Sequence, residues 1–254
     1  MVNILISGCC GKMGNAIVNC ASNRNDISVV GGIDKYTNQH SYNFPVYDSF
    51  KSVTDNFDVV VDFSHPSLLN DLLEYCVSNK KACVIATTGY TDIDIENIKA
   101  ASKVIPIFFT FNMSLGINLL VELSKMAAQV LGNNFDIEII EKHHNLKIDA
   151  PSGTALMLAD SINSVCDNKF DYEYNRHSKR EKRTDSEIGI HSIRAGTIVG
   201  EHEVIFGGQD EVISLKHTAY SKNVLATGAI NAAVFISSCS NGLYDMNDYL
   251  NSKK

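Results

Sequence analysis

Residues 2–14 read VNILISGCCGKMG, and they set the class of fold to expect. The apolar run Val2–Ser7 ends at a glycine, as a buried parallel strand often does. Apolar residues then recur at helical spacing over Met13–Cys20, which predicts a helix. Glycines between a strand and a helix let the backbone approach a pyrophosphate, and the N–H groups at the helix start can bind it. The stretch therefore predicts the start of a dinucleotide-binding domain.

Strands and helices continue to alternate after this unit. Apolar runs bounded by turn residues predict strands over Ile27–Ile33, Asp58–Phe63, Ala82–Ala86 and Ile105–Phe109. Helices are expected after Ser67, which can cap one, and near Asp92–Ser102. This alternation is typical of βαβ units in a parallel sheet.

The glycine turn has a carboxylate partner later in the chain. The glycines follow the pattern G-x-x-G-x-x-G, and Asp34 stands at the end of the second expected strand. A carboxylate there can accept hydrogen bonds from the ribose hydroxyls of a dinucleotide. Asp34 would repel the 2′-phosphate of NADP and so favours NADH, but Lys35 can offset that repulsion. Both NADH and NADPH stay open.

The pattern changes after about residue 112. We expect a second domain with helices over Gly116–Leu131 and Gly153–Cys166 and strands over Phe135–Glu141, Ile188–Arg194, Gly200–Phe206 and Glu211–His217, and then a last helix over Val224–Ser237. The polar–apolar alternation of the later strands suits an open sheet with one exposed or partner-covered face. The fold class is therefore α/β: an N-terminal Rossmann-type parallel sheet (1–113), a second α+β domain on an open mixed sheet (114–222), and a C-terminal segment (223–254) that returns to the first domain.

A basic stretch lies within the second domain, over Asp167–Glu187. It contains the cations Arg176, Lys179, Arg180, Lys182 and Arg183, which Glu181, Asp185 and Glu187 dilute. Two interpretations stay open, a solvated loop or a loop that closes over an anionic ligand.

The densest polar cluster is residues 141–155, which read EKHHNLKIDAPSGTA. Imidazoles such as those of His143 and His144 titrate near neutrality, and a partly desolvated lysine such as Lys147 can donate a proton. The segment Ser152-Gly153-Thr154 opens a helix, and its hydroxyls and N–H groups suit a substrate carboxylate. No metal-ligand spacing is present, and Lys147 would repel a cation.

The amino-acid composition excludes several classes of protein. The chain has 254 residues, 44% of them hydrophobic and 20% charged, which is ordinary globular usage. A net charge of −7 argues against a general nucleic-acid-binding surface, and no apolar run approaches the ~20 residues of a membrane helix. No signal peptide is visible at the N-terminus.

Seven scattered cysteines with no C-x-x-C pair fit a reducing cytoplasm. Adjacent Cys9 and Cys10 are either small packed side chains or a redox pair.

The cluster also carries a resemblance to a known family. The run Glu138–His143, then Lys147, Asp149 and Pro151–Ala155, resembles the signature of the 4-hydroxy-tetrahydrodipicolinate reductases of lysine and diaminopimelate synthesis. Supporting segments occur in the expected order along the whole chain: Gly8–Gly14, Thr87–Gly89, Asn112–Gly116, Arg194–Gly196 and Val199–His202.

The resemblance implies a homotetramer that uses NADH or NADPH, without a metal, on a small dicarboxylate substrate. It implies that His143 is catalytic, that Lys147 is the proton donor, and that Lys147 with a protonated histidine attracts the dianion. It places the substrate at His144, Ser152, Gly153 and Thr154. It places the cofactor at Gly8, Cys9, Cys10, Gly11, Lys12, Met13, Asp34, Lys35, Ala86, Thr87, Thr88, Thr110, Phe111, Asn112 and Met113.

The sequence departs from the family at four positions. Cys10 and Ala86 stand where glycine is common, Met113 where Phe often lies beneath the nicotinamide, and Lys222 where arginine is common. We expect these changes to tune affinity. Two alternatives stay open: another NAD(P)-linked dehydrogenase of a small carboxylate, and a non-catalytic dinucleotide-binding redox sensor.

Overall fold

The computed structural model describes residues 1–37 and 42–253 and divides into two compact units. The first unit is Met1–Leu115 together with Lys222–Lys254, and the second is Gly116–Ser221. The expected divisions, after residues 113 and 222, lie close to these.

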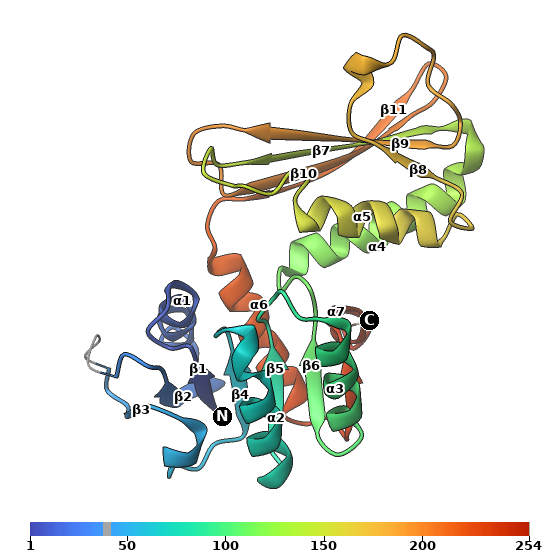
Figure 1. The fold of residues 1–254 in the computed structure, drawn as a ribbon. Coiled ribbons are helices and arrows are strands. Elements are labelled where there is room, and N and C mark those ends of the chain that lie inside the picture. The colour runs from blue at the N-terminus through green and yellow to red at the C-terminus, as the bar shows by residue number, and fades with distance from the viewer. Residues whose placement is uncertain (38–41, 254) are drawn as a thin grey trace. The chain divides into compact units, whose positions relative to one another are not determined.

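The first unit is built on a parallel sheet of seven strands (Figure 1). The strands are β1 (Val2–Ser7), β2 (Ile27–Ile33), β3 (Val46–Tyr47), β4 (Val59–Asp62), β5 (Ala82–Ile85), β6 (Pro106–Phe109) and β12 (Gly242–Tyr244). Their order is β12-β6-β5-β4-β1-β2-β3, and every neighbouring pair is parallel. Because the strands are parallel, the loops that follow β1, β2, β4 and β5 lie at one edge of the sheet.

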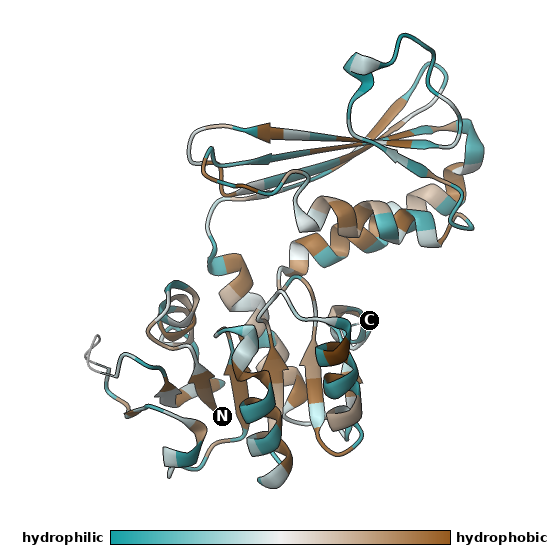
Figure 2. Cartoon of the chain, viewed as in Figure 1, coloured by the Kyte–Doolittle hydropathy of each residue, from teal (hydrophilic) through white to brown (hydrophobic). Residues whose placement is uncertain are grey.

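Helices cover both faces of this sheet. They are α1 (Lys12–Ala21), α2 (Leu69–Ser78), α3 (Asp92–Ser102), α6 (Asn223–Ile236) and α7 (Met246–Asn251), with short 3-10 turns η1 (Phe50–Ser52) and η2 (Pro66–Leu68). One buried cluster joins Ile17 of α1 and Ile230 of α6 to Ile6 of β1. Another joins Leu72 of α2 to Leu5 of β1, because successive side chains of a strand point to opposite faces. Figure 2 shows the hydrophobic colour gathered on the central strands.

The start of α2 differs from the prediction. Ser67 does not cap this helix, because it lies inside η2, which precedes α2. The cap of η2 is His65, whose Nδ1 accepts a 3.2 Å hydrogen bond from the Ser67 N–H.

The second unit is built on a mixed sheet of five strands. These are β7 (Asp136–His143), β8 (Asp171–Glu173), β9 (Glu187–Arg194), β10 (Gly200–Gly207) and β11 (Val212–Ala219), in the order β11-β10-β7-β9-β8. The other elements are α4 (Leu115–Leu131), α5 (Gly153–Ser164), η3 (Gly132–Asn134) and η4 (Arg176–Ser178). Strand β7 is parallel to β9 and antiparallel to β10. The predicted fold class, a Rossmann-type sheet with a second mixed-sheet domain, is confirmed.

Helices α4 and α5 supply the core of the second unit. Leu120 of α4 and Leu158 of α5 pack with Ile139 of β7 and Val204 of β10. Burial alternates along β10, as expected for a sheet with one helix-covered face and one open face. Strand β7 runs two residues further than predicted and ends at His143, which fixes the backbone of that histidine in the sheet.

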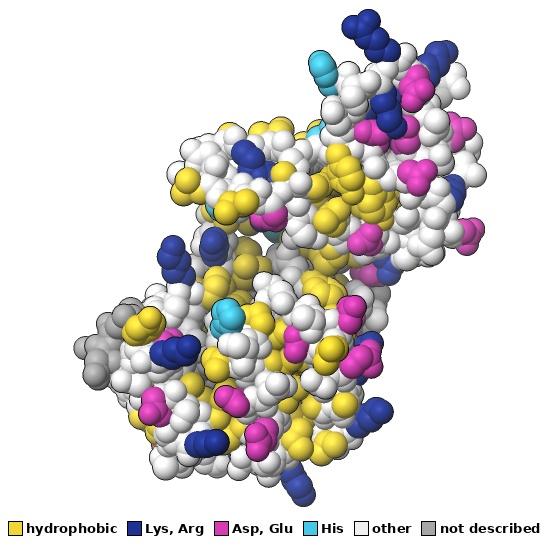
Figure 3. Space-filling model, viewed as in Figure 1, with side chains coloured by type: hydrophobic (Ala, Val, Ile, Leu, Met, Phe, Trp, Pro, Cys, Tyr) yellow, Lys and Arg dark blue, Asp and Glu magenta, His cyan; other side chains and the backbone are white. Residues whose placement is uncertain are grey.

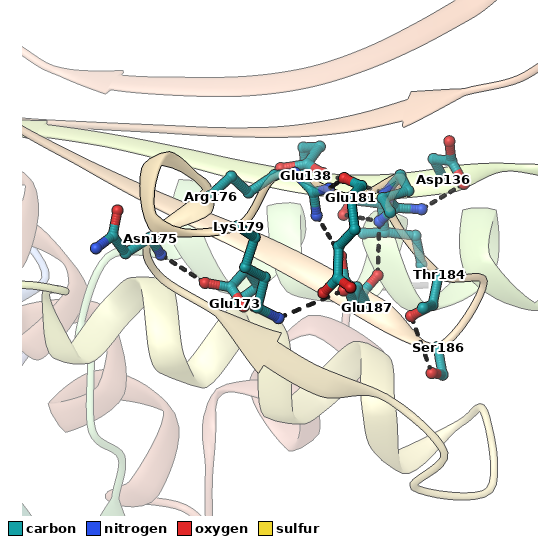
Figure 4. Close-up of polar contacts among 12 residues, drawn as sticks. Asp136, Glu138, Glu173, Asn175, Arg176, Lys179, Glu181, Thr184, Ser186 and Glu187 are labelled. Carbon is teal, nitrogen blue, oxygen red and sulfur yellow. Dashed lines mark hydrogen bonds and ion pairs between the residues drawn. The ribbon is translucent and has the colours of Figure 1, made fainter.

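The basic stretch is not a wholly solvated loop, because several of its cations form ion pairs (Figure 4). Its interpretation as a loop that closes over an anionic ligand stays a prediction. The stretch contains β8 and η4, which were not predicted. Arg176 contacts Glu187 at 2.5 Å, Lys179 pairs with Glu173, and Arg183 pairs with Asp136. These cations are therefore neutralised by acidic side chains of the unit's own sheet.

Positive and negative side chains are interspersed on the face of the molecule shown in Figure 3. Among the helices of the described residues, none combines the length and apolar character that crossing a membrane requires.

Candidate active site

The glycine turn after β1 has the backbone that its sequence predicts. Gly8 has φ +80°, which side chains disfavour, and a Cβ there would lie 2.5 Å from the carbonyl oxygen of Phe63. A Cβ at Gly14 would collide with the backbone of Gly8 and Cys9. The Gly11 N–H donates to the Gly8 carbonyl at 3.1 Å, which closes the turn. Glycine is thus required at positions 8 and 14 for the turn to exist.

Asp34 ties the end of β2 to this turn. One carboxylate oxygen accepts a 2.9 Å hydrogen bond from the Cys10 N–H, and the other accepts one of 3.1 Å from the Tyr36 N–H. Gly11, Asp34 and the exposed Lys35 line a pocket of about 530 Å³ within the first unit. The carboxylate is therefore held at the wall of a cavity that begins at the glycine turn.

The vicinal cysteines are packed thiols. Cys9 is fully buried, Cys10 is partly buried, and their sulfurs are 3.9 Å apart. Burial is the main reason that the pKa of each thiol is raised above its usual value. Of the two interpretations of this pair, the burial of Cys9 and the 3.9 Å separation of the sulfurs fit small packed side chains.

A buried carboxylate that the sequence analysis overlooked lies under the next two loops. Asp62, at the end of β4, is 1% exposed. It accepts 2.6 Å hydrogen bonds from the hydroxyls of Ser64 and Thr87, and the Ser64 N–H donates to the Thr87 oxygen at 2.9 Å. Burial raises the pKa of Asp62, although these hydrogen bonds oppose the rise. The available signal was an aspartate closing the apolar run Val59–Val61.

The other residues expected to contact the cofactor differ in their solvent exposure. Lys12, Thr88 and Phe111 are exposed, Met13, Thr110 and Asn112 are intermediate, and Ala86, Thr87 and Met113 are buried. Met113 is 2% exposed and belongs to the core beside α6, where a Cβ on Gly228 would collide with its carbonyl oxygen. Its side chain therefore packs in the core of the first unit, and its contact with the cofactor stays a prediction.

In the second unit, five side chains form what we call the Glu141 cluster: Glu141, His143, Ser152, Arg194 and His202. Glu141 is fully buried in β7 and accepts a 2.6 Å hydrogen bond from Nδ1 of His143. Arg194 of β9 donates to both Glu141 oxygens, at 2.6 and 2.8 Å, and also to the Asp149 carbonyl. The Ser152 N–H donates to Glu141 at 3.1 Å. The carboxylate thus joins two strands to the start of α5.

These contacts fix the charges of the cluster. Burial alone would raise the pKa of Glu141, but hydrogen bonds from Arg194 and His143 outweigh it and lower the pKa to about 2. Burial lowers the pKa of His143 below its usual value despite the opposing effect of Glu141. A carboxylate can only accept, so Nδ1 of the neutral ring carries the proton. Burial therefore favours the neutral imidazole here, and the protonated histidine that the resemblance implies beside a dianionic substrate stays a prediction.

His202 of β10 adds a second neutral imidazole. Its Nε2 is 3.1 Å from the Ser152 hydroxyl, and its ring centre is 5.2 Å from that of His143. Burial, the main cause, and nearby positive groups lower the pKa of His202 to about 3. Its Nδ1 has no hydrogen-bond partner among the described residues. Sequence analysis gave His202 no role, because it lies fifty positions from Ser152 and only the sheet brings the two together.

Three of the four expected substrate residues, Ser152, Gly153 and Thr154, form the start of α5. The Ser152 hydroxyl caps this helix by accepting a 3.2 Å hydrogen bond from the Ala155 N–H. A Cβ on Gly153 would meet nothing within 4 Å, so open space adjoins the helix start. Lys147 forms a 2.9 Å ion pair with Asp149. His144 is half-buried, and its carbonyl accepts the Lys147 N–H at 3.1 Å.

The two units together define a class of protein. A parallel sheet with a glycine turn and an acidic residue after β2 is the architecture of dinucleotide-binding domains. The second unit supplies a buried imidazole–carboxylate pair, a lysine and a helix start, which suit acid–base chemistry on an anion. This combination defines a two-domain oxidoreductase.

The comparisons with known proteins narrow this class. Residues 2–113 match the family model for the N-terminus of dihydrodipicolinate reductase, and residues 116–250 match the model for its C-terminus. The chain therefore belongs to the dihydrodipicolinate reductase family.

Known relatives match this chain over nearly its full length. The chain is 49% identical to the 4-hydroxy-tetrahydrodipicolinate reductase of Caldanaerobacter subterraneus, covering 98% of both chains. It is 48% identical to that of Clostridium tetani, covering 99% of this chain and 98% of the relative. The solved structure of dipicolinate-bound dihydrodipicolinate reductase from Paenisporosarcina sp. TG-14 superposes with a TM-score of 0.80 at 28% identity, covering 97% and 99%.

Proposed function

We propose that this enzyme reduces 4-hydroxy-2,3,4,5-tetrahydrodipicolinate to 2,3,4,5-tetrahydrodipicolinate, with loss of water, in lysine and diaminopimelate synthesis. The observation that carries the proposal is the match to both halves of one reductase family, in order, along nearly the whole chain. The Glu141 cluster supports it, because its geometry suits proton control beside an anionic substrate.

The first unit fits a reduced nicotinamide dinucleotide, which would supply the hydride. Gly8 and Gly14 allow the close backbone approach that a pyrophosphate needs, and Asp34 stands at the wall of the adjoining pocket. Lys35 lines the same pocket, so we propose that both NADH and NADPH are accepted. Asp62 would hold the loops that carry Ser64 and Thr87 in place.

In the second unit, the helix start at Gly153 and Thr154 would bind one substrate carboxylate, with Ser152 and His144 beside it. Lys147 would leave Asp149, contact the substrate, and give the proton from its Nζ to the carbanion that hydride addition creates. His143 would present Nε2 toward the substrate, since Glu141 holds Nδ1. Approach of a dianion favours the charged imidazole, so substrate binding would raise the pKa of His143.

We further propose a homotetramer located in the cytoplasm. The open face of the second sheet offers a surface for subunit contacts, and all seven cysteines are free thiols. Light scattering of the purified chain measures the mass, and a monomer would remove this part of the proposal.

The test is a coupled assay in which the upstream synthase makes the substrate in place from pyruvate and aspartate semialdehyde. We expect oxidation of NADH and of NADPH that depends on the synthase. The ratio of the NADH rate to the NADPH rate measures the cofactor preference that Asp34 and Lys35 jointly set. Folded protein that binds NADH but gives no synthase-dependent oxidation would overturn the proposal and favour a non-catalytic sensor. Oxidation of a different small carboxylate alone would favour another dehydrogenase.

A further inference from the structure

The turn after β1 brings together three groups that can bind a metal ion: two thiols, which are soft donors, and one carboxylate, which is a hard donor. The sulfurs of Cys9 and Cys10 are 3.9 Å apart, and one ligand atom each from Cys9, Cys10 and Asp34 all lie within 4.8 Å of one another. No other set of three such residues gathers this closely in the part of the chain that the structure describes.

The spacing of these atoms matches a metal site better than a disulfide. Two thiolates bound to tetrahedral Zn²⁺ at about 2.3 Å lie about 3.8 Å apart, close to the distance seen here. A disulfide needs sulfurs about 2.05 Å apart, so oxidation of this pair would require the turn to move. The Tyr36 carbonyl oxygen lies 3.4 Å from the Cys10 sulfur and offers a further oxygen donor.

The site is open on one side. Cys9 is fully buried, but Cys10, Asp34 and Tyr36 line the pocket of about 530 Å³. A cation can therefore approach from the pocket and displace the thiol protons on binding. Two thiolates and a carboxylate select a thiophilic divalent ion over Mg²⁺ or Ca²⁺, which prefer oxygen donors.

We propose that Cys9, Cys10 and Asp34 bind Zn²⁺ or Cd²⁺, and that the bound ion excludes the dinucleotide. The exclusion rests on the proposed function, because it requires the cofactor to use the same turn and carboxylate. A cation held by Asp34 takes the oxygens that would accept the ribose hydroxyls, and it occupies the pocket wall beside the glycine turn.

Binding is measured first without any dinucleotide, by titrating the chelator-treated, reduced protein with Cd²⁺ and recording thiolate-to-metal charge-transfer absorption. We expect one ion per chain. Cys10→Ser should weaken binding by at least about tenfold, since it removes one ligand at a partly exposed position. Cys20→Ser on α1 is the matched control, and we expect unchanged affinity. Equal affinity of wild type and Cys10→Ser, or absence of the absorption band, would overturn the site.

Competition is measured second, by repeating the titration at increasing NADH. Mutually exclusive binding makes the apparent Kd for Cd²⁺ rise in proportion to the NADH concentration. A ternary complex, with the charge-transfer band intact at saturating NADH, would overturn the exclusion. Failure of NADH to bind the metal-free protein would count against the proposed function and not against the metal site. The Cd²⁺ titration without NADH tests the metal site separately.

Discussion

The Glu141 carboxylate, which has no solvent exposure, accepts a 2.6 Å hydrogen bond from Nδ1 of His143. Residues i and i+2 of a strand point to the same face, so β7 itself sets this pair. Arg194 lies opposite His143 in the register of β9 and neutralises Glu141 from the neighbouring strand. The sheet thereby fixes the tautomer of His143 and directs Nε2 away from the carboxylate.

Glu141→Gln should lower kcat by about tenfold or more, because the amide no longer fixes the tautomer of His143. It should also destabilise the fold by about 3 kcal/mol, since Arg194 loses its buried counter-charge. Steady-state kinetics and urea unfolding measure the two effects. Glu138→Gln is the matched control, because Glu138 lies on the same strand and contacts His191 at 2.7 Å at a more exposed position. Equal loss of kcat in both variants would contradict the positioning role of Glu141.

Lys147→Ala should lower kcat by about a hundredfold or more while NADH binding is retained, because the proposed proton donor is removed. Lys147→Arg keeps the charge but not a readily transferred proton, so it should restore substrate KM more than kcat. NADH fluorescence measures binding, and the coupled assay measures turnover. A near-normal kcat in Lys147→Ala would remove this residue from the reaction.

Asp62→Asn should raise the Kd for NADH severalfold, because an amide cannot accept from both hydroxyls that the carboxylate holds. We expect kcat at saturating cofactor to change less than KM for the cofactor, which distinguishes loop positioning from general damage. Asp58→Asn provides the control, since Asp58 precedes β4 and accepts a 2.8 Å hydrogen bond from the Asn3 N–H at an exposed position. Unchanged NADH binding in Asp62→Asn would show that the loops do not depend on this carboxylate.

The stability of the protein should fall as pH drops below about 6.5. The pKa of His202 is about 3 in the folded chain and 6.5 when unperturbed, so between these values the unfolded chain binds more protons. The free energy of unfolding then falls by up to about 1.4 kcal/mol per pH unit for this one group. Glu141 acts in the same direction below pH 4.5, because its folded pKa is about 2.

His202→Gln should therefore flatten the decline between pH 6.5 and 4.5, measured by urea unfolding at several pH values. His177→Gln, at an exposed histidine, should leave the slope unchanged. A His202→Gln slope equal to that of the wild type would mean that other groups cause the acid loss.

Local sequence patterns were sufficient to predict the class of fold. The strand Val2–Ser7 is followed by glycines at positions 8 and 14. The positive φ of Gly8 and the clash of a Cβ on Gly14 with the Gly8 and Cys9 backbone are local requirements that the sequence pattern reflects. Short elements were missed. The edge strands β3 and β12 have only two and three residues, and helix α7 has six, which is too few to carry a clear periodic signal. The ion pair between Arg183 and Asp136 of β7 was not predicted, because the two residues lie 47 positions apart.

The sequence alone determined what depends on neighbouring residues: the glycine turn, the helix start at Ser152, and the strand that carries Glu141 and His143. Tertiary structure decided what depends on burial and on contacts between distant segments. The lowered pKa of His143, the contact of His202 with Ser152, and the approach of Asp34 to Cys9 and Cys10 belong to this second group. Desolvation and side-chain distance arise only when strands far apart in sequence become neighbours in a sheet.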